Sequence, residues 1–249
     1  MTPFFSAEGE AAIRDAVRRR ALLVLDFDGT LAPIVDDPAA AAMRPTTRAL
    51  LRTIAMLLPC AVVSGRARAD VAPRVAGVPL RAIVGNHGAE PARMEAPSAI
   101  RARVRGWAAA LRTALAEPGV SVEDKGFSIA VHVRRAAAPD LAQERAARLA
   151  AGLAGARVFG GKRVVNVVPE TAPTKADAVE AFAAEFPASP VMYVGDDETD
   201  EDAFRSPAVT WSVRVGHADR SAARFFLGGQ AEIDTLLQAL TLEHAHQSA

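Results

Sequence analysis

Two aspartates, Asp26 and Asp28, stand one residue apart in the stretch VLDFDGTLAPIV, directly after an apolar run typical of a buried strand. Side chains two residues apart in an extended chain point the same way, so we expect both carboxylates to face one place. A carboxylate can attack an electrophile or move a proton. The pair therefore predicts a catalytic site at the end of a strand.

Other polar residues stand where further apolar runs end. Ser64 follows the run CAVV, Asp196 and Asp200 follow the run VMYVG, and Lys175 begins a predicted helix. Functional groups in an open α/β sheet gather beyond the carboxyl ends of its strands, so we expect these residues to meet there. Clustered carboxylates repel one another and raise one another's pKa. A divalent cation relieves that repulsion, and an all-oxygen ligand set suits Mg²⁺.

The remaining groups suit a phosphoryl substrate. The Ser64 hydroxyl and the Lys175 ammonium are donors that a phosphoryl group requires, and backbone amides near Gly29 and Gly65 add to that cradle. Mg²⁺ with few protein ligands usually also contacts substrate phosphate. We therefore expect phosphoryl transfer through an aspartyl-phosphate, in which one carboxylate attacks phosphorus and the other moves protons.

The elements that position these residues indicate an α/β core with an insertion. Apolar strands alternate with helices on both sides of the insertion, which is typical of a parallel sheet covered by helices on both faces. The helices expected in the core span residues 6–20, 46–57, 66–75, 174–186 and 231–242, and the strands span 21–27, 60–65, 80–85, 191–195 and 208–213. We expect the chain to fray after Leu242.

The insertion has a different pattern. Helices are expected over residues 98–117 and 139–153, each followed by a pair of strands, with turns at residues 124–126 and at Gly160-Gly161. This pattern predicts a small α+β domain with an antiparallel sheet. We expect linkers at residues 91–97 and 169–173, a core of residues 1–92 and 172–249, and an inserted domain of residues 93–171.

Composition limits the classes of partner. The chain has 249 residues, and its 29 basic and 29 acidic side chains give a formal net charge of zero, so nothing indicates a nucleic-acid-binding protein. The single cysteine, Cys60, lies in an apolar run and predicts a reducing compartment. No apolar run approaches the roughly 18 residues of a membrane span. We expect a cytoplasmic protein, working as a monomer, without a membrane or nucleic-acid partner.

In this order, DFDGTL, SGR, a lysine after the insertion and GDDETD resemble the haloacid dehalogenase superfamily of phosphatases. The resemblance implies a Rossmann-like parallel-sheet core with an inserted α+β cap domain. It implies Asp26 as nucleophile, Asp28 as general acid/base, and Ser64 and Lys175 as phosphate ligands. The implied Mg²⁺ site consists of Asp26, the carbonyl of Asp28 and Asp196, with Asp200 holding a metal-bound water or supporting the ligands.

The stretches GNHGAE, VEDKGFSIAVHVR and GDDETDEDAF are similar to trehalose-6-phosphate phosphatases. In that family the cap closes over the sugar, and its motif maps onto Glu123 and Lys125 as ligands of glucosyl hydroxyls; taken alone, these two also fit a charge pair in a hairpin turn. His132 and Arg134 match the family's HxR element. The other substrate-binding candidates are Thr30, Arg66, His87 and Asn166.

Two positions depart from that family's pattern. Asn166 stands where the family often has glutamate, and Ala176 stands where a glycine usually follows the lysine. Asparagine keeps the hydrogen-bonding capacity but loses the charge.

The implied activity is Mg²⁺-dependent hydrolysis of trehalose 6-phosphate to trehalose and phosphate. The alternatives are a phosphatase of another glycosyl phosphate, such as sucrose phosphate or mannosyl-phosphoglycerate, a sugar phosphomutase, and a non-catalytic binding protein. The presence of both Asp26 and Asp28 argues against the last, because a binding protein does not need both carboxylates.

Overall fold

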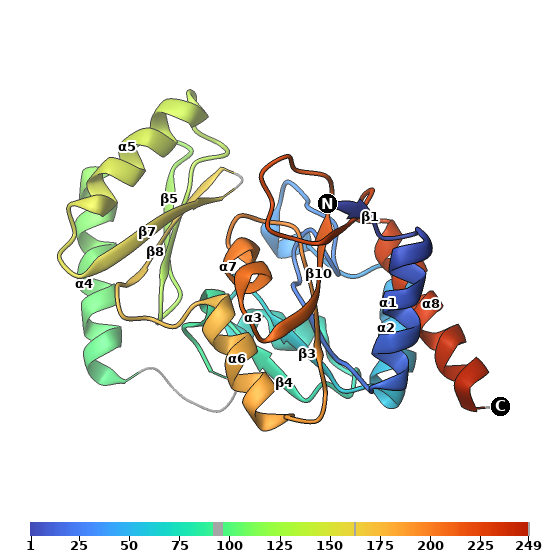
Figure 1. Cartoon of the computed structure of the whole chain (residues 1–249). Coiled ribbons are helices and arrows are strands. Elements are labelled where there is room, and N and C mark those ends of the chain that lie inside the picture. Colours follow the sequence, from blue (N-terminus) through green and yellow to red (C-terminus); the bar gives the residue numbers. More distant parts are fainter. Residues whose placement is uncertain (92–96, 162, 249) are drawn as a thin grey trace. The chain divides into compact units, whose positions relative to one another are not determined.

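The computed structural model describes residues 1–91, 97–161 and 163–248, which form two compact units (Figure 1). The first unit consists of Met1–Gly88 and Thr174–Ala249, and the second consists of Ala89–Pro173. The second unit is thus inserted into the sequence of the first. Most of the linker expected at residues 91–97, and the expected boundary between residues 92 and 93, lie outside the described residues.

The first unit is built on a parallel sheet of seven described strands in the order β1-β11-β10-β9-β2-β3-β4. The expected parallel α/β core is therefore confirmed. Two short strands, β1 and β11, have no counterpart in the sequence prediction. The strands are β1 (Thr2–Pro3), β2 (Leu22–Leu25), β3 (Cys60–Val63), β4 (Ala82–Val84), β9 (Val191–Gly195), β10 (Val209–Val215) and β11 (Phe225–Leu227).

Helices pack on both faces of this sheet because alternate strand residues point to opposite sides. Leu23 and Leu25 lie in one buried cluster, which includes side chains of α1 (Ala7–Arg18), α2 (Pro45–Leu57), α3 (Arg68–Arg74) and α8 (Glu232–Ser248). Leu22 and Val24 lie in the opposite cluster, with side chains of α6 (Lys175–Glu185) and α7 (Asp200–Arg205). Two short 3₁₀ helices, Pro38–Ala40 and Asn86–Gly88, lie in the loops.

Hydrogen bonds define the ends of several helices. Ser6 caps α1, as expected, by accepting a hydrogen bond from the backbone N of Gly9 at 3.4 Å. At the start of α6, Thr174 and Asp177 form a reciprocal capping box that fixes the first turn. The expectation that the chain frays after Leu242 is wrong, because α8 continues to Ser248 and Gln247 donates a hydrogen bond to the carbonyl of Arg14 in α1.

The second unit has an antiparallel sheet in the order β5-β6-β8-β7, with two helices packed against one face. Its elements are α4 (Ser98–Ala114), β5 (Ser121–Asp124), β6 (Ile129–His132), α5 (Pro139–Ala151), β7 (Ala156–Gly161) and β8 (Val164–Pro169). The expected α+β insertion and its first turn are confirmed. The turn expected at Gly160-Gly161 is wrong, because both glycines pair with β8 and belong to β7. Across the described ranges, no helix has the length and apolarity to cross a membrane.

Candidate active site

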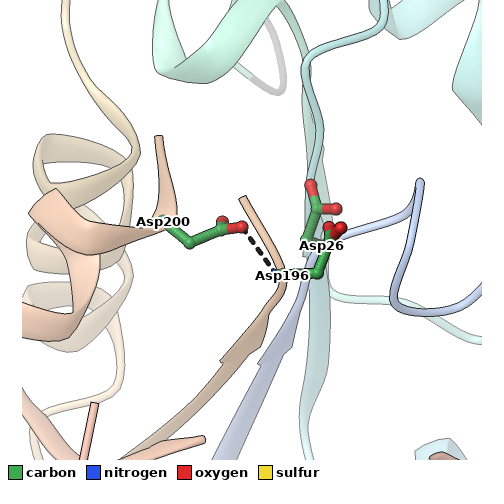
Figure 2. Close-up of side chains that lie close together, drawn as sticks. All are labelled: Asp26, Asp196 and Asp200. Atoms are coloured by element: carbon green, nitrogen blue, oxygen red, sulfur yellow. Dashed lines mark hydrogen bonds between the residues drawn. The ribbon is translucent and has the colours of Figure 1, made fainter. Parts of the chain in front are cut away.

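Three carboxylates converge at the carboxyl ends of two neighbouring strands (Figure 2). Asp26 follows β2, Asp196 follows β9, and Asp200 begins α7. One oxygen of each carboxylate lies within 4.8 Å of the others, and all three residues are buried. The structure thus brings together three of the four aspartates expected to form a metal site.

The Asp200 carboxylate accepts four hydrogen bonds. Its Oδ2 accepts from the backbone N of Asp196 at 2.9 Å and of Asp197 at 2.8 Å. Its Oδ1 accepts from Lys175 Nζ at 2.7 Å and from the Tyr193 hydroxyl at 2.6 Å. Asp200 therefore ties the loop after β9 to the first turn of α6.

Lys175 is a buried ammonium placed between two carboxylates. Its Nζ donates to Asp26 Oδ1 at 2.8 Å as well as to Asp200, and the residue is only 3 % exposed. Burial lowers the pKa of Lys175, but the charges of Asp200 and Asp26 outweigh it and raise this pKa well above its usual value. A lysine at a helix N-terminus opposes the helix dipole, and these two ion pairs explain why it is stable there.

The same charges act on Asp26. Burial raises the pKa of its carboxyl well above the usual value, Lys175 opposes that change, and the nearby Asp200 and Asp196 add to it. Three carboxylates with one ammonium leave an excess of negative charge in a buried place. An all-oxygen donor set of this kind fits a hard divalent cation.

Gly29 lets the loop after β2 approach this cluster closely. A Cβ at Gly29 would lie 2.1 Å from Asp196 Oδ2, and the backbone φ of +84° is in the left-handed region that favours glycine. A side chain at this position would therefore displace one of the three carboxylates.

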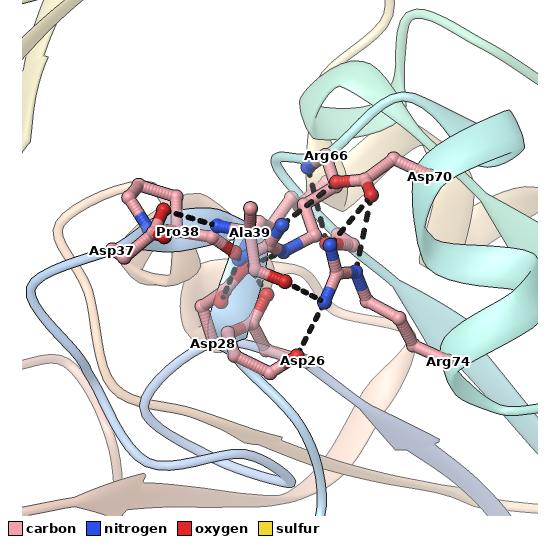
Figure 3. A network of polar contacts seen from close by, with 11 residues as sticks. Asp26, Asp28, Asp37, Pro38, Ala39, Arg66, Asp70 and Arg74 are labelled. Atoms are coloured by element: carbon pink, nitrogen blue, oxygen red, sulfur yellow. Dashed lines mark hydrogen bonds and ion pairs between the residues drawn. The ribbon is translucent and has the colours of Figure 1, made fainter.

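Asp28 has a different partner from Asp26, and Arg66 contacts it in the polar network of Figure 3. Its two oxygens accept from Arg66 Nε and from one terminal nitrogen of Arg66, each at 2.7 Å. Strand β2 ends at Leu25 and the chain turns beyond it, with Ala32 N donating to Phe27 O at 2.8 Å.

Arg66 is held inside the protein on three sides. Besides Asp28, it donates to Asp70 Oδ2 at 2.7 Å and to the carbonyl of Pro38 at 2.9 Å. Burial opposes its charge, but the hydrogen bonds and charges of Asp28 and Asp70 raise the pKa of Arg66 further above its usual value. Its guanidinium binds protein groups, whereas the sequence predicts a substrate contact.

Two candidate residues, Ser64 and His87, follow strands β3 and β4 at the carboxyl end of the first unit's sheet. Thr30 lies on the loop after β2. Ser64 is fully buried and its Oγ accepts from Arg66 N at 3.1 Å, while its carbonyl accepts from His87 N at 2.9 Å. The His87 ring packs over Gly65, where a Cβ would lie 2.4 Å from Cε1. Within the described ranges the buried hydroxyl of Thr30 has no hydrogen-bond partner.

In the second unit, Glu123 and Asn166 share one face of the sheet. Glu123 pairs with Ala130 of β6, and Ala130 pairs with Asn166 of β8, so all three lie in one cross-strand row. The neighbouring residues Ile129 and Val131, and Val165 and Val167, pack against the helices, so this row faces away from α4 and α5.

The row continues to Phe159 of β7, which pairs with Asn166. Glu123 Oε2 also lies 2.8 Å from Nε2 of His132, the histidine of the HxR element. Lys125 lies in the turn after β5, where its backbone N donates to Ser128 O at 2.9 Å.

Tyr193 is a site residue that the sequence patterns do not reveal. It is the only tyrosine in the chain and is fully buried in β9, yet its hydroxyl reaches Asp200. The sequence signal that could reveal it is one hydroxyl-bearing side chain in an otherwise apolar strand. In such a strand an aromatic residue is normally assigned to the core.

Comparison with known proteins identifies the family. The family model for trehalose-phosphatase matches residues 24–224. The chain belongs to the trehalose-phosphatase family. This membership confirms the resemblance carried by the motifs. A trehalose-phosphate phosphatase from Mycobacterium marinum is 37% identical over 225 residues, which are 83% of this chain and 57% of that protein. The chain thus spans little more than half the length of this curated trehalose-phosphatase relative.

Solved structures show the same fold. The C-terminal domain of the C. albicans trehalose-6-phosphate phosphatase has a TM-score of 0.77 with 22% sequence identity, and the match covers 98% of each chain. A phosphatase of the HAD superfamily from Bacteroides thetaiotaomicron has a TM-score of 0.58 with 17% identity, covering 90% of this chain and 94% of that one. This trehalose-phosphatase family member therefore has the α/β fold expected for the superfamily.

Proposed function

We propose that this protein is a phosphatase that hydrolyses trehalose 6-phosphate to trehalose and inorganic phosphate. The observation that carries the proposal is the buried ammonium of Lys175 between Asp26 and Asp200, at the edge where Asp196 completes a carboxylate cluster. Family membership supports the choice of substrate, because the related proteins act on trehalose phosphate according to their names.

The reaction divides into two displacements. An oxygen of Asp26 attacks phosphorus, the bond from phosphorus to the sugar oxygen breaks, and that oxygen takes a proton from the carboxyl group of Asp28. Asp28 then takes a proton from water, which attacks phosphorus and releases phosphate, so that Asp26 is restored. Each oxygen of Asp28 accepts one hydrogen bond from Arg66 and keeps a lone pair for the proton.

Phosphate contacts would come from the first unit. The Lys175 ammonium and the Ser64 hydroxyl would donate to phosphoryl oxygens. Thr30 and His87 lie on loops beyond strands of the same sheet and are secondary candidates. Mg²⁺ would be held by Asp26, Asp196 and the carbonyl of Asp28, with Asp200 supporting them, and when bound it would supply positive charge that offsets the phosphoryl oxygens.

Sugar recognition would come from the second unit, which we interpret as the cap domain. Glu123 and Asn166 lie in one row on the sheet face opposite the helices, and Lys125 follows at the end of β5. A carboxylate, an amide and an ammonium supply both acceptors and donors for sugar hydroxyls. The residues of this face would therefore distinguish a disaccharide phosphate from a small phosphate ester.

A substrate panel tests the function. Phosphate release is measured with Mg²⁺ on trehalose 6-phosphate, sucrose 6-phosphate, mannosyl-3-phosphoglycerate and glucose 6-phosphate. We expect kcat/KM for trehalose 6-phosphate to exceed that for glucose 6-phosphate by about 100-fold, because a site built for the hydroxyls of the second glucosyl ring rejects a substrate lacking that ring. Equal rates would refute the substrate, and conversion of a sugar phosphate to its isomer without phosphate release would indicate a mutase.

A further inference from the structure

The Tyr193 side chain is fixed deep in the first unit. Tyr193 lies in β9, where it pairs with Val24 of β2 on one side and with Ser212 of β10 on the other. Its ring is fully buried and meets the ring of Phe204 in α7 edge-on, with the centroids 5.7 Å apart. A hydroxyl on so rigid a ring has one accessible position, and there it donates to Asp200 Oδ1 at 2.6 Å.

This hydrogen bond completes the acceptor capacity of Asp200. A carboxylate has about four lone-pair sites, and Asp200 receives two backbone N–H groups, the Lys175 ammonium and the Tyr193 hydroxyl. The hydroxyl keeps its proton, because burial and the charge of Asp200 raise the pKa of Tyr193 well above its usual value.

The consequence concerns the third hydrogen of Lys175. An ammonium group has three N–H donors, of which one points to Asp26 and one to Asp200. Without the tyrosine hydroxyl, Oδ1 of Asp200 would offer a second site to this ammonium. Lys175 would then move toward Asp200 and away from Asp26.

We propose that Tyr193 is a positioning residue, whose hydroxyl occupies the remaining acceptor site of Asp200 and so holds the Lys175 ammonium against Asp26 with one N–H directed to substrate phosphate. This inference rests on the proposed function, since it assigns Lys175 to the phosphoryl group. It adds to the site a residue that never touches the substrate.

The first test is Tyr193→Phe, which removes one oxygen atom and keeps the ring. Because the displaced ammonium would act mainly in phosphoryl transfer, we expect kcat to fall about tenfold while KM and the Mg²⁺ dissociation constant measured by calorimetry change less than about twofold. The matched control is Phe204→Leu, which disturbs the packing of the same ring and leaves the hydroxyl in place. It is expected to lower Tm while kcat stays within about twofold.

The second test does not depend on turnover or on a stable variant. Because the chain has a single tyrosine, 3-fluorotyrosine places one ¹⁹F nucleus at this position. We expect the ¹⁹F resonance to shift when the protein with Mg²⁺ is saturated with inorganic phosphate, since Lys175 connects the anion to Asp200 and the hydroxyl.

The outcomes separate the two hypotheses. If the wild-type protein hydrolyses no phosphate ester but the ¹⁹F resonance responds to phosphate, the proposed function fails and the positioning role stands. If Tyr193→Phe keeps the wild-type kcat, if Phe204→Leu loses kcat equally, or if phosphate leaves the ¹⁹F resonance unmoved, the positioning role is refuted.

Discussion

Arg66 holds both carboxylate oxygens of Asp28 in a two-pronged ion pair, with both N···O distances 2.7 Å (Figure 3). The other side of the guanidinium is fixed by Asp70 and by the carbonyl of Pro38. Asp70 is itself held by Arg74 at 2.8 Å. The proposed acid/base is thus connected through Arg66 to helix α3 and to the loop that contains Pro38.

Arg66→Lys tests whether this arginine positions Asp28. Lysine keeps the charge but cannot reproduce the two parallel hydrogen bonds, so Asp28 would lose its orientation. We expect kcat to fall about tenfold with little change in KM. Steady-state kinetics measure both constants, and Arg74→Lys, one step further from Asp28, serves as the control with a smaller effect. A raised KM at unchanged kcat would instead make Arg66 a substrate ligand.

Gly29→Ala is expected to disrupt the carboxylate cluster. The new Cβ would lie 2.1 Å from Asp196 Oδ2, so the side chain or the loop has to move, and we expect kcat to fall about 100-fold. Gly77→Ala is a matched control, because Gly77 has the same φ of +84° but nothing within 4 Å of its Cβ position. It should cost about 1 kcal/mol of unfolding free energy and leave kcat unchanged. Equal kinetic effects would show that backbone strain alone is responsible.

Asp26→Asn should abolish turnover, because an amide oxygen cannot form the aspartyl-phosphate. We expect phosphate release to fall by about 1,000-fold or more. Circular dichroism and thermal unfolding verify that the variant remains folded; the loss of one of three repelling carboxylates offsets part of the lost ion pair with Lys175. Substantial residual activity in a folded variant would place the nucleophile elsewhere.

Glu123→Ala separates sugar recognition from phosphoryl transfer. We expect kcat/KM for trehalose 6-phosphate to fall about tenfold more than kcat/KM for p-nitrophenyl phosphate, because in the proposed function only the sugar substrate would contact this carboxylate. Glu144→Ala removes an exposed carboxylate from α5, against which the other face of the sheet packs, and should affect neither substrate. Equal losses on both substrates would exclude Glu123 from sugar binding.

The buried thiol of Cys60 makes the free energy of unfolding depend on pH in the alkaline range. Burial raises the pKa of its thiol from 9.0 to about 12. Above pH 9.0 the unfolded chain therefore releases this proton while the folded protein retains it. The contribution of the thiol to the free energy of unfolding is thus complete below pH 9.0 and declines toward pH 12. The free energies of unfolding of the wild-type protein and of Cys60→Ala, measured by chemical denaturation, should diverge in this pH range by at most about 1.4 kcal/mol per pH unit. Parallel pH curves would contradict the assignment.

Much of the fold follows from patterns that the sequence displays openly. The run Leu22–Leu25 and its counterparts are too short and too apolar for amphipathic helices, and their alternation with helices predicts the parallel sheet. The first turn of the inserted unit is also predictable from the sequence, because it contains a glycine. Gly126 adopts a φ of +79° there, a backbone conformation that few other residues adopt. Strands β1 and β11 are not predicted, because segments of two or three residues are too short to show a hydrophobic periodicity.

The site divides in the same way. Asp26, Lys175 and Asp196 are predictable from their places at the ends of elements, because topology brings strand ends together. The partner of Asp28 is not, because the chain turns after β2 and Arg66 lies 38 residues away. The role of the Tyr193 hydroxyl is unpredictable for another reason. The apolar strand accounts for the burial of the aromatic ring but gives no information about the hydroxyl at its end.

The position of β9 between β2 and β10 has a consequence for biosynthesis. Translation delivers β2, β3 and β4 first, then the entire inserted unit, and only afterwards the strand that pairs with the open side of β2. The nascent polypeptide therefore carries an unsatisfied strand edge while the insertion emerges, a condition that favours binding by ribosome-associated chaperones. Asp26 meets Lys175, 149 residues later in the chain, only after the inserted unit has been synthesised.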